Sequence, residues 1–310
     1  MKPGHAVAAA GACTAAYVVA LAWADARNQV FAQLPQVLAW MPSMAGLAFA
    51  SYLLRYLRWR WLLSRAGHSV PWGPGFLGYL SGFAFTATPG KVGELVRVRY
   101  FSRHGVPTAR TVSAFVYERA FDLLCVVLLA ALAIPALPLF AVLVAFVAGM
   151  IGAVVLVAAR PAWLLRSAAC LRRCGWPRVS RAVRALAMGL AGCRAWLHPL
   201  DLGLSLGLGL IAWGVVALSF AWLLRGLGID LPWRDAVSLY PTAMLAGAAS
   251  MLPAGIGTTE ATLVALLALQ AVPIGLGTLA AVGIRVATLW FAVLCGFAAI
   301  AVLEHRRGPA

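Results

Sequence analysis

Two pairs of opposite charge recur in this 310-residue sequence, because a glutamate precedes an arginine by the same 25 positions in each pair. The pairs are Glu94 with Arg119 and Glu260 with Arg285. Guanidinium groups bind phosphate and carboxylate oxygens through paired hydrogen bonds. The spacing therefore allows two chemistries: the arginines bind an anionic group, or each glutamate only ties its own arginine to a neighbouring segment.

Two more acidic residues lie beside the first pair. Glu118 and Asp122 are four positions apart, which places them on one face of a helix, and Ile284 and Thr288 stand at the matching positions of the second half. Asp122 is also one turn from Arg119, so a local ion pair is the structural alternative to a shared site. The difference predicts unlike roles for the two halves.

The composition predicts a polytopic membrane protein. Hydrophobic residues make up 63%, the mean hydropathy is +0.89 and charged residues reach only 11%, against roughly 25% in soluble proteins. The six cysteines and five histidines are scattered and form no metal-binding motif, so we expect no metal and no cofactor. The net charge of +16 has no nucleic-acid-binding motif behind it and is read as topology bias and attraction to anionic lipid.

Hydrophobic stretches predict about six full spans, since a spanning helix needs roughly 20 mostly apolar residues. They lie at about 5–24, 38–63, 110–134, 138–159, 201–227 and 275–303. Most basic residues fall at Lys2, from Arg55 to Arg110, from Arg160 to Arg194, and at Arg306 and Arg307. The positive-inside rule then predicts a multi-pass inner-membrane protein with both termini in the cytoplasm.

The cytoplasmic linker between Arg160 and His198 carries two amphipathic pieces divided by residues 174–177. Such helices are expected to lie on anionic headgroups, and Trp163, Trp176 and Trp196 favour the membrane interface.

The two halves of the chain repeat. Trp61, Pro71 and Tyr79 recur at one constant offset as Trp222, Pro232 and Tyr240, and the Glu/Arg pairs recur at a slightly larger one. Each copy reads as a helix, a broken hydrophobic stretch and another helix. The arms are 76–88 with 92–103 and 236–252 with 256–271, each too short to span a membrane.

The breaks are typical of hinges in re-entrant hairpins, whose irregular backbone must lie inside the protein or along a water-filled cavity. The hinge residues are Pro89, Gly93, Pro253, Gly255 and Gly257. Counting the spans predicts inverted repeats, and interrupted segments at matching positions of such repeats indicate a transporter site near the midplane.

We therefore expect an all-α chain in five parts. Residues 1–34 form an N-terminal transmembrane helix and loop, 35–134 repeat 1, 135–199 a linking helix and basic amphipathic linker, 200–304 repeat 2, and 305–310 a basic tail.

The candidate substrate-binding residues are Arg119, Arg285, Glu94, Glu260, Glu118 and Asp122. The glutamates would hold the arginines, titrate in proton coupling or contact a cationic headgroup. Lys91, Arg97 and Arg99 either attract anionic headgroups to the cytoplasmic mouth or are ordinary positive-inside charge. The matched Tyr79 and Tyr240 are expected to serve in packing rather than as ligands.

The sequence resembles the integral membrane domain of lysylphosphatidylglycerol synthase/flippase (MprF-type) proteins, in a stand-alone form. The resemblance rests on Pro89-Gly90-Lys91-Val92-Gly93-Glu94 with Arg97, on Glu118-Arg119 with Asp122, on residues 253–260, and on Arg285. It implies inverted repeats with re-entrant hairpins and an activity that moves lipids between leaflets. No aminoacyl-transferase domain follows residue 303, so lysyl-lipid synthesis is not expected of these residues.

The sequence thus predicts a non-enzymatic lipid translocase. It would bind an anionic phospholipid or another lipid-phosphate at a midplane Arg/Glu site and move it between leaflets by alternating access. Two alternatives stay open: a membrane-embedded transferase acting on a lipid carrier, and a non-transporting scaffold for lipid-synthesis enzymes. Against the transferase, the only close carboxylate pair, Glu118 with Asp122, lies in a predicted helix rather than a polar loop. A homo-oligomer or a lipid-synthesis enzyme remains open as a protein partner.

Overall fold

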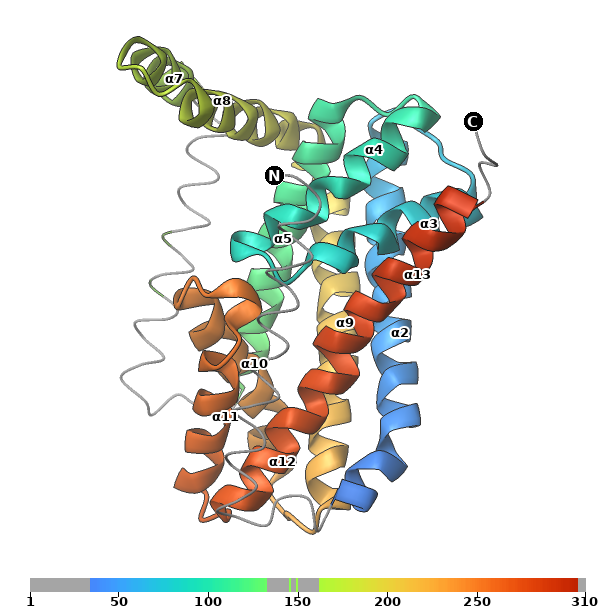
Figure 1. Ribbon diagram of the computed structural model, residues 1–310, viewed down its shortest axis with the longest axis vertical. Helices are drawn as coiled ribbons and strands as arrows, with labels where there is room; N and C mark the ends of the chain where they lie inside the picture. Colours follow the sequence, from blue (N-terminus) through green and yellow to red (C-terminus); the bar gives the residue numbers. More distant parts are fainter. Residues whose placement is uncertain (1–33, 133–144, 146–148, 150–161, 306–310) are drawn as a thin grey trace.

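The computed structural model describes residues 34–132, 145, 149 and 162–305, and every regular element in these ranges is helical (Figure 1). The predicted spans at 5–24 and 138–159, together with the tail at 306–310, lie outside the described residues, apart from Ala145 and Gly149.

Three described helices are long and apolar enough to cross a membrane. They are α2 (Leu34–Arg65), α9 (Pro199–Gly226) and a continuous helix of 32 residues from Ile274 to His305. The last consists of α12 (Ile274–Arg285), one π-helical turn, η7 (Val286–Trp290), and α13 (Phe291–His305). These three helices confirm the expected spans at 38–63, 201–227 and 275–303.

Helix α5 (Thr108–Ala130) covers most of the stretch expected to span at 110–134. It has 23 residues, enough to cross a hydrocarbon core of about 30 Å. It is not as apolar as the other three helices, because the charged residues Glu118, Arg119 and Asp122 occupy its middle turns. Helix α5 therefore needs neighbours that neutralise these charges.

Two broken segments stand at the positions that the sequence marks with Pro and Gly. The first runs through α3 (Trp72–Ser81), η2 (Gly82–Phe85), η3 (Pro89–Val96), α4 (Arg97–Phe101) and η4 (Ser102–His104). The second runs through α10 (Trp233–Ala249), η6 (Pro253–Gly255) and α11 (Thr258–Leu269). Thr88 and Leu252, which precede the two prolines, have extended backbone, as the ring of a following proline demands.

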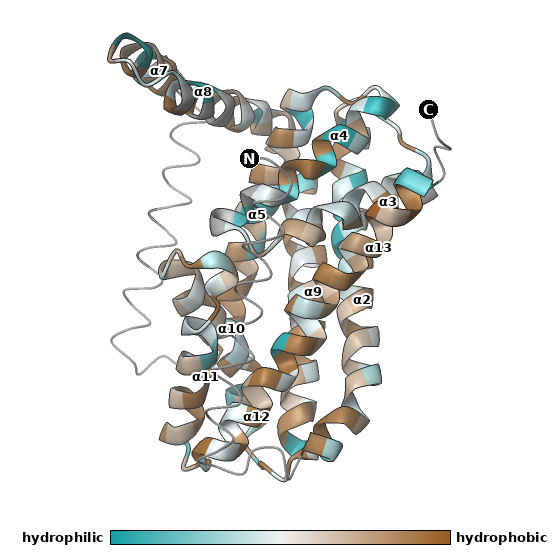
Figure 2. Cartoon of the chain, viewed as in Figure 1, coloured by the Kyte–Doolittle hydropathy of each residue, from teal (hydrophilic) through white to brown (hydrophobic). Residues whose placement is uncertain are grey.

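The long helices hold these broken segments together. Helices α2 and α9 pack side by side, and α13 crosses over α3 and η2 (Figure 1). Helix α10 packs against α5, α9 and α11, and η3 touches η6, so the two breaks meet in the interior. Hydrophobic residues follow α9, α12 and α13, whereas polar residues gather around α4 and the end of α13 (Figure 2).

The linker forms α7 (Ala162–Arg173) and α8 (Pro177–Gly192), followed by η5 (Cys193–Trp196). The break between α7 and α8 falls at the predicted residues, and the pair lies across one end of the long helices (Figure 1). Trp163 and Trp176 are exposed, whereas Trp196 is buried inside the protein. Its ring is fully buried against Tyr117, and its indole N–H donates to the Leu62 carbonyl at 2.8 Å.

The crossing of α13 over η2 requires a glycine, and Gly296→Ala tests this. A Cβ at Gly296 would collide with the backbone of Ala84, which cannot rotate away as a side chain would. We expect Gly296→Ala to lower the free energy of unfolding by about 1–3 kcal/mol. The measurement is thermal unfolding of the detergent-purified protein.

The control is Gly214→Ala in α9, where a Cβ meets nothing within 4 Å. It should leave stability unchanged or raise it by up to about 1 kcal/mol, because alanine is the better helix former. Equal stability of the two variants would contradict the close packing of α13 on η2.

Candidate functional site

Asp122 on α5 is the point where three arginines converge. Its carboxylate accepts hydrogen bonds from Arg55 at 2.9 Å and from Arg58 at 2.5 Å, both on α2. Arg119, one turn away on α5, approaches the same carboxylate to 2.9 Å. The local Arg119–Asp122 pair expected from the sequence is therefore present, but it is part of a larger set.

Glu118, one turn before Asp122 and fully buried, joins a second group of partners. Arg97 Nη1 donates to it at 3.0 Å, the Tyr79 hydroxyl donates to its other oxygen, and Arg119 lies at 3.3 Å. Arg97 Nη2 also donates to Glu94 at 2.8 Å. Through these contacts α2, η3, α4 and α5 share one ion network, to which Tyr79 of α3 is hydrogen-bonded. The members of the network are Arg55, Arg58, Arg97, Arg119, Glu94, Glu118 and Asp122.

Arg97 corrects the reading of the basic stretch after the first break. Its side chain has no exposed surface, and its guanidinium lies over the rings of Tyr79 at 4.5 Å and Trp59 at 4.8 Å. A residue so enclosed cannot recruit headgroups at the cytoplasmic mouth. Arg99 behaves as predicted for a surface charge: its side chain is 59% exposed, and it lies 3.5 Å from Glu304.

Glu94 joins the ion network to the first break. Its carboxylate accepts hydrogen bonds from Arg97 and, at 2.9 Å, from the Thr86 hydroxyl. Arg119, its expected partner, is 3.7 Å away. Gly93 donates its N–H to the Thr88 hydroxyl at 2.8 Å, and a Cβ at Gly93 would collide with Phe85. The predicted hinge glycine is thus required by close backbone approach.

The second Glu/Arg pair holds the second break. Arg285 Nε donates to Glu260 at 2.7 Å, and its Nη2 donates to the Ala254 carbonyl at 2.8 Å. Glu260 in turn accepts from the Gly257 N–H at the start of α11, at 2.8 Å. Gly255 and Gly257 both have positive φ, which glycine adopts without steric cost. The expected hinge residues Pro253, Gly255 and Gly257 therefore lie next to the charged pair.

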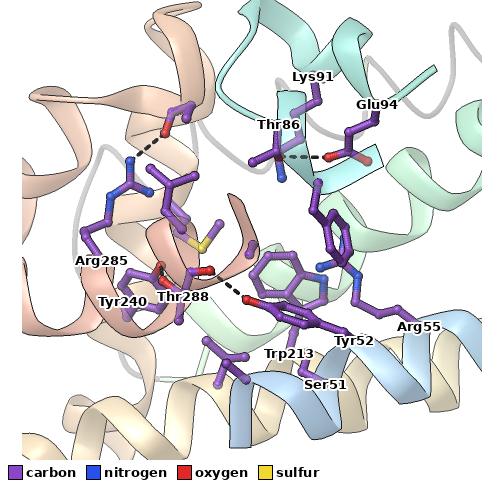
Figure 3. Close-up of a pocket in the computed structure, with 17 residues that line it drawn as sticks. Ser51, Tyr52, Arg55, Thr86, Lys91, Glu94, Trp213, Tyr240, Arg285 and Thr288 are labelled. Carbon is purple, nitrogen blue, oxygen red and sulfur yellow. Dashed lines mark hydrogen bonds between the residues drawn. The ribbon is translucent and has the colours of Figure 1, made fainter. Parts of the chain in front are cut away.

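A cavity separates the two charged groups (Figure 3). Arg285 lies on one side and Lys91, Thr86 and Glu94 lie on the other. The space in this cavity that the centre of a water molecule can occupy is about 80 Å³. One bound water needs roughly 10–15 Å³ on that measure, so a group the size of phosphate fits. The wall comes from α2, η2, η3, α9, α10, η6, α12, η7 and α13.

Hydroxyl groups line the cavity between its charged sides. The Tyr52 hydroxyl donates to the Thr288 carbonyl at 2.7 Å within the π-helical turn, and the Tyr240 and Thr288 hydroxyls are 3.0 Å apart. Tyr79 and Tyr240 were expected to serve in packing or as interface anchors rather than as ligands. Both are buried, yet each also places its hydroxyl in a polar network.

Buried N–H donors in this region lack acceptors. Arg55 Nε and Trp213 Nε1 both belong to cavity-lining side chains, and neither has a hydrogen-bond partner in the described part of the chain. Further unpaired donors stand on Arg58, Arg97 and Arg119 behind the cavity wall. A buried donor without an acceptor is costly, so the site favours a ligand that is rich in acceptor oxygens.

The comparisons with known proteins give the family. The family model described as the lysylphosphatidylglycerol synthase TM region matches residues 6–296. The chain belongs to this family. Membership means a membrane protein with a lipid-related function, and it confirms the resemblance found in the sequence. A search of curated proteins finds no match.

Sequence reasoning missed two residues of this site, Arg55 and Arg58. They were counted as cytoplasmic charge, although both fall within the predicted span at 38–63. In the structure they are 6% and 0% exposed and face α5. Arginines three positions apart inside an apolar run, opposite a carboxylate pair in another helix, are the signal that identifies such residues. Arg119, expected to bind substrate, is paired with carboxylates and does not line the cavity.

The structure offers no metal centre in the described ranges, where no group of three His, Cys, Asp or Glu side chains could hold an ion.

Asp122→Asn tests the ion network. The amide removes one charge but leaves three buried guanidinium groups around it, and breaking a buried pair from one side costs about 3–5 kcal/mol. We expect a large fall in thermal stability of the purified protein. The control is Glu304→Gln, because the Arg99–Glu304 pair is partly exposed and should contribute at most about 1 kcal/mol. Similar losses for both variants would refute a special role for the network.

Proposed function

We propose that this protein is a flippase-like lipid translocase that binds the phosphate of an anionic phospholipid or another lipid-phosphate in the central cavity. The observation that carries the proposal is the cavity wall, where Arg55, Lys91 and Arg285 come from different parts of the chain and line one cavity. Intramembrane charges usually mark substrate paths, and arginine is suited to phosphate recognition. No reacting group is needed for transport, so we propose no catalysis.

The depth of the site supports this function. At 1.5 Å per residue, Arg285 lies about 17 Å from the start of the Ile274–His305 helix, and Arg55 lies about 15 Å from the end of α2. A hydrocarbon core is about 30 Å thick. Both helices have 32 residues and are longer than the core, so both arginines lie several residues inside the stretch that can cross it, where a headgroup on its way between leaflets needs a polar site.

We infer that the two halves are inverted repeats with re-entrant hairpins. In each half a short segment follows a proline break, and an arginine from a later helix lies near its glutamate: Arg119 near Glu94 and Arg285 near Glu260. The breaks touch each other beside the cavity. Interrupted segments that meet at a midplane site are typical of transporters that work by alternating access. The acyl tails would stay in the surrounding lipid.

The orientation proposed for the chain places the basic end in the cytoplasm. Helices α4, α7 and α8 and the end of α13 gather at one end of the bundle (Figure 1). Helices α4, α7 and α8 carry Arg99, Arg166, Arg172, Arg173, Arg181 and Arg184. The positive-inside rule assigns such an end to the cytoplasmic side of an inner membrane.

Leaflet exchange of fluorescent phospholipids in proteoliposomes tests the function. We expect the wild type to exchange anionic phospholipids faster than protein-free vesicles do. Arg285→Gln should lower the rate about tenfold or more, because it removes a charge-assisted bond to the phosphate. Arg285→Lys, which keeps the charge but loses the planar fork, should retain part of the rate.

The matched control is Arg225→Gln, since that arginine is 47% exposed and stacks on Trp233 away from the cavity. It should exchange lipid like the wild type. All variants are compared at equal reconstitution and with equal elution profiles. Exchange that does not exceed that of empty vesicles, across several headgroups, would contradict the proposal and favour a transferase or a scaffold.

A further inference from the structure

We infer that the cavity selects a lipid that ends in a doubly charged phosphate, a phosphomonoester, over lipids with singly charged or zwitterionic headgroups. The inference rests on the proposed function for its lipid source, but its charge preference stands on the described residues alone. It begins with the charge that the fold encloses around the cavity.

The enclosed groups carry more positive than negative charge. The ion network combines four arginines with three carboxylates, which leaves one positive charge. The Arg285–Glu260 pair is neutral, and Lys91 adds a second positive charge at the cavity wall. The contributing residues in the described part of the chain are Arg55, Arg58, Lys91, Arg97, Arg119 and Arg285 against Glu94, Glu118, Asp122 and Glu260.

Lys91 is the cation that remains uncompensated. No carboxylate of the described ranges lies within 4.0 Å of its ammonium group, whereas Arg55 and Arg285 each have an acidic partner. Its backbone is left-handed, with φ of 55°, an unfavourable conformation for a residue with a Cβ. Glycines stand at positions 90 and 93 nearby, yet the strained position carries a lysine. Its side chain lines the cavity, beside Thr86 and Glu94 (Figure 3).

The unpaired hydrogen-bond donors favour the same kind of ligand as the excess positive charge does. Arg55 Nε and Trp213 Nε1 are buried donors without acceptors, and both residues line the cavity. A phosphomonoester offers about −1.5 to −2 charges at pH 7 and three strong acceptor oxygens. It therefore satisfies both the donors and the excess charge. A phosphodiester leaves one positive charge unmatched, and a zwitterionic headgroup brings an ammonium group toward the arginines.

The experiment measures lipid binding to the detergent-purified full-length protein by native mass spectrometry at pH 7, where a phosphomonoester carries about −1.5 to −2 charges. The probes are phosphatidate, phosphatidylglycerol and phosphatidylethanolamine with identical acyl chains, and inorganic phosphate. We expect phosphatidate to bind about tenfold more tightly than phosphatidylglycerol, since one more charged interaction forms. Lys91→Gln should weaken the binding of both anionic lipids, and it should weaken phosphatidate about tenfold more than phosphatidylglycerol, so that the preference disappears.

Arg99→Gln is the control, because it removes one positive charge from an exposed side chain outside the cavity. It should keep the preference for phosphatidate. Equal wild-type binding of phosphatidate and phosphatidylglycerol would overturn the inference, and so would a preference that survives in Lys91→Gln. Displacement of phosphatidate by inorganic phosphate at equal concentration would overturn the inference that the bound phosphate belongs to a lipid.

Exchange of the same three lipids in proteoliposomes separates this inference from the proposed function. A phosphatidate preference in binding without leaflet exchange would refute translocation and leave the charge selectivity standing. Equal exchange of all three lipids would refute the selectivity and leave translocation standing.

Discussion

The rest of the structure depends on the neutralisation of buried charge between α2 and α5. Four arginines and three carboxylates occupy this crossing, and nearly all their side chains are withdrawn from solvent. An ion moved into a low-dielectric interior loses several kcal/mol of hydration, which only close partners recover. Each of the carboxylates therefore needs guanidinium groups from more than one element. The network fixes how α2, η3, α4 and α5 lie relative to one another.

That constraint explains why irregular backbone is stable so deep in the bundle. Glu94 is held by Arg97 and Thr86, so η3 can follow the break at Pro89 without a regular helix around it. Exposed backbone groups have no water to bind in a hydrocarbon interior, so such segments survive only inside protein or along a polar cavity. Here the breaks touch each other beside a cavity. The ion network thus supplies both the fixed wall and the polarity of the site.

Hydropathy predicted the long helices, because a long run of apolar residues is most stable as a helix in the hydrocarbon core of a membrane. The Glu260–Arg285 contact was also predictable, since the same spacing occurs in both halves. The identity of the buried arginines was not, because sequence rules read basic residues near a helix end as topology bias. Arg55 lies nearly three turns before the end of α2, and only the approach of α5 decides that it faces inward. Arg97 belongs to the same class: its burial depends on Glu118, which is distant in sequence.

The two halves differ in how strongly their breaks are held. The first break is tied to the ion network through Glu94, which is bound by Arg97 and lies near Arg119. The second relies on Arg285, which binds both Glu260 and the Ala254 carbonyl. Thr288, whose hydroxyl lies 3.0 Å from that of Tyr240, stands where the first half has Asp122. A neutral hydrogen bond is about half as strong as a charge-assisted one. The second break is therefore held by fewer charged contacts than the first, which Glu94 ties to the whole ion network.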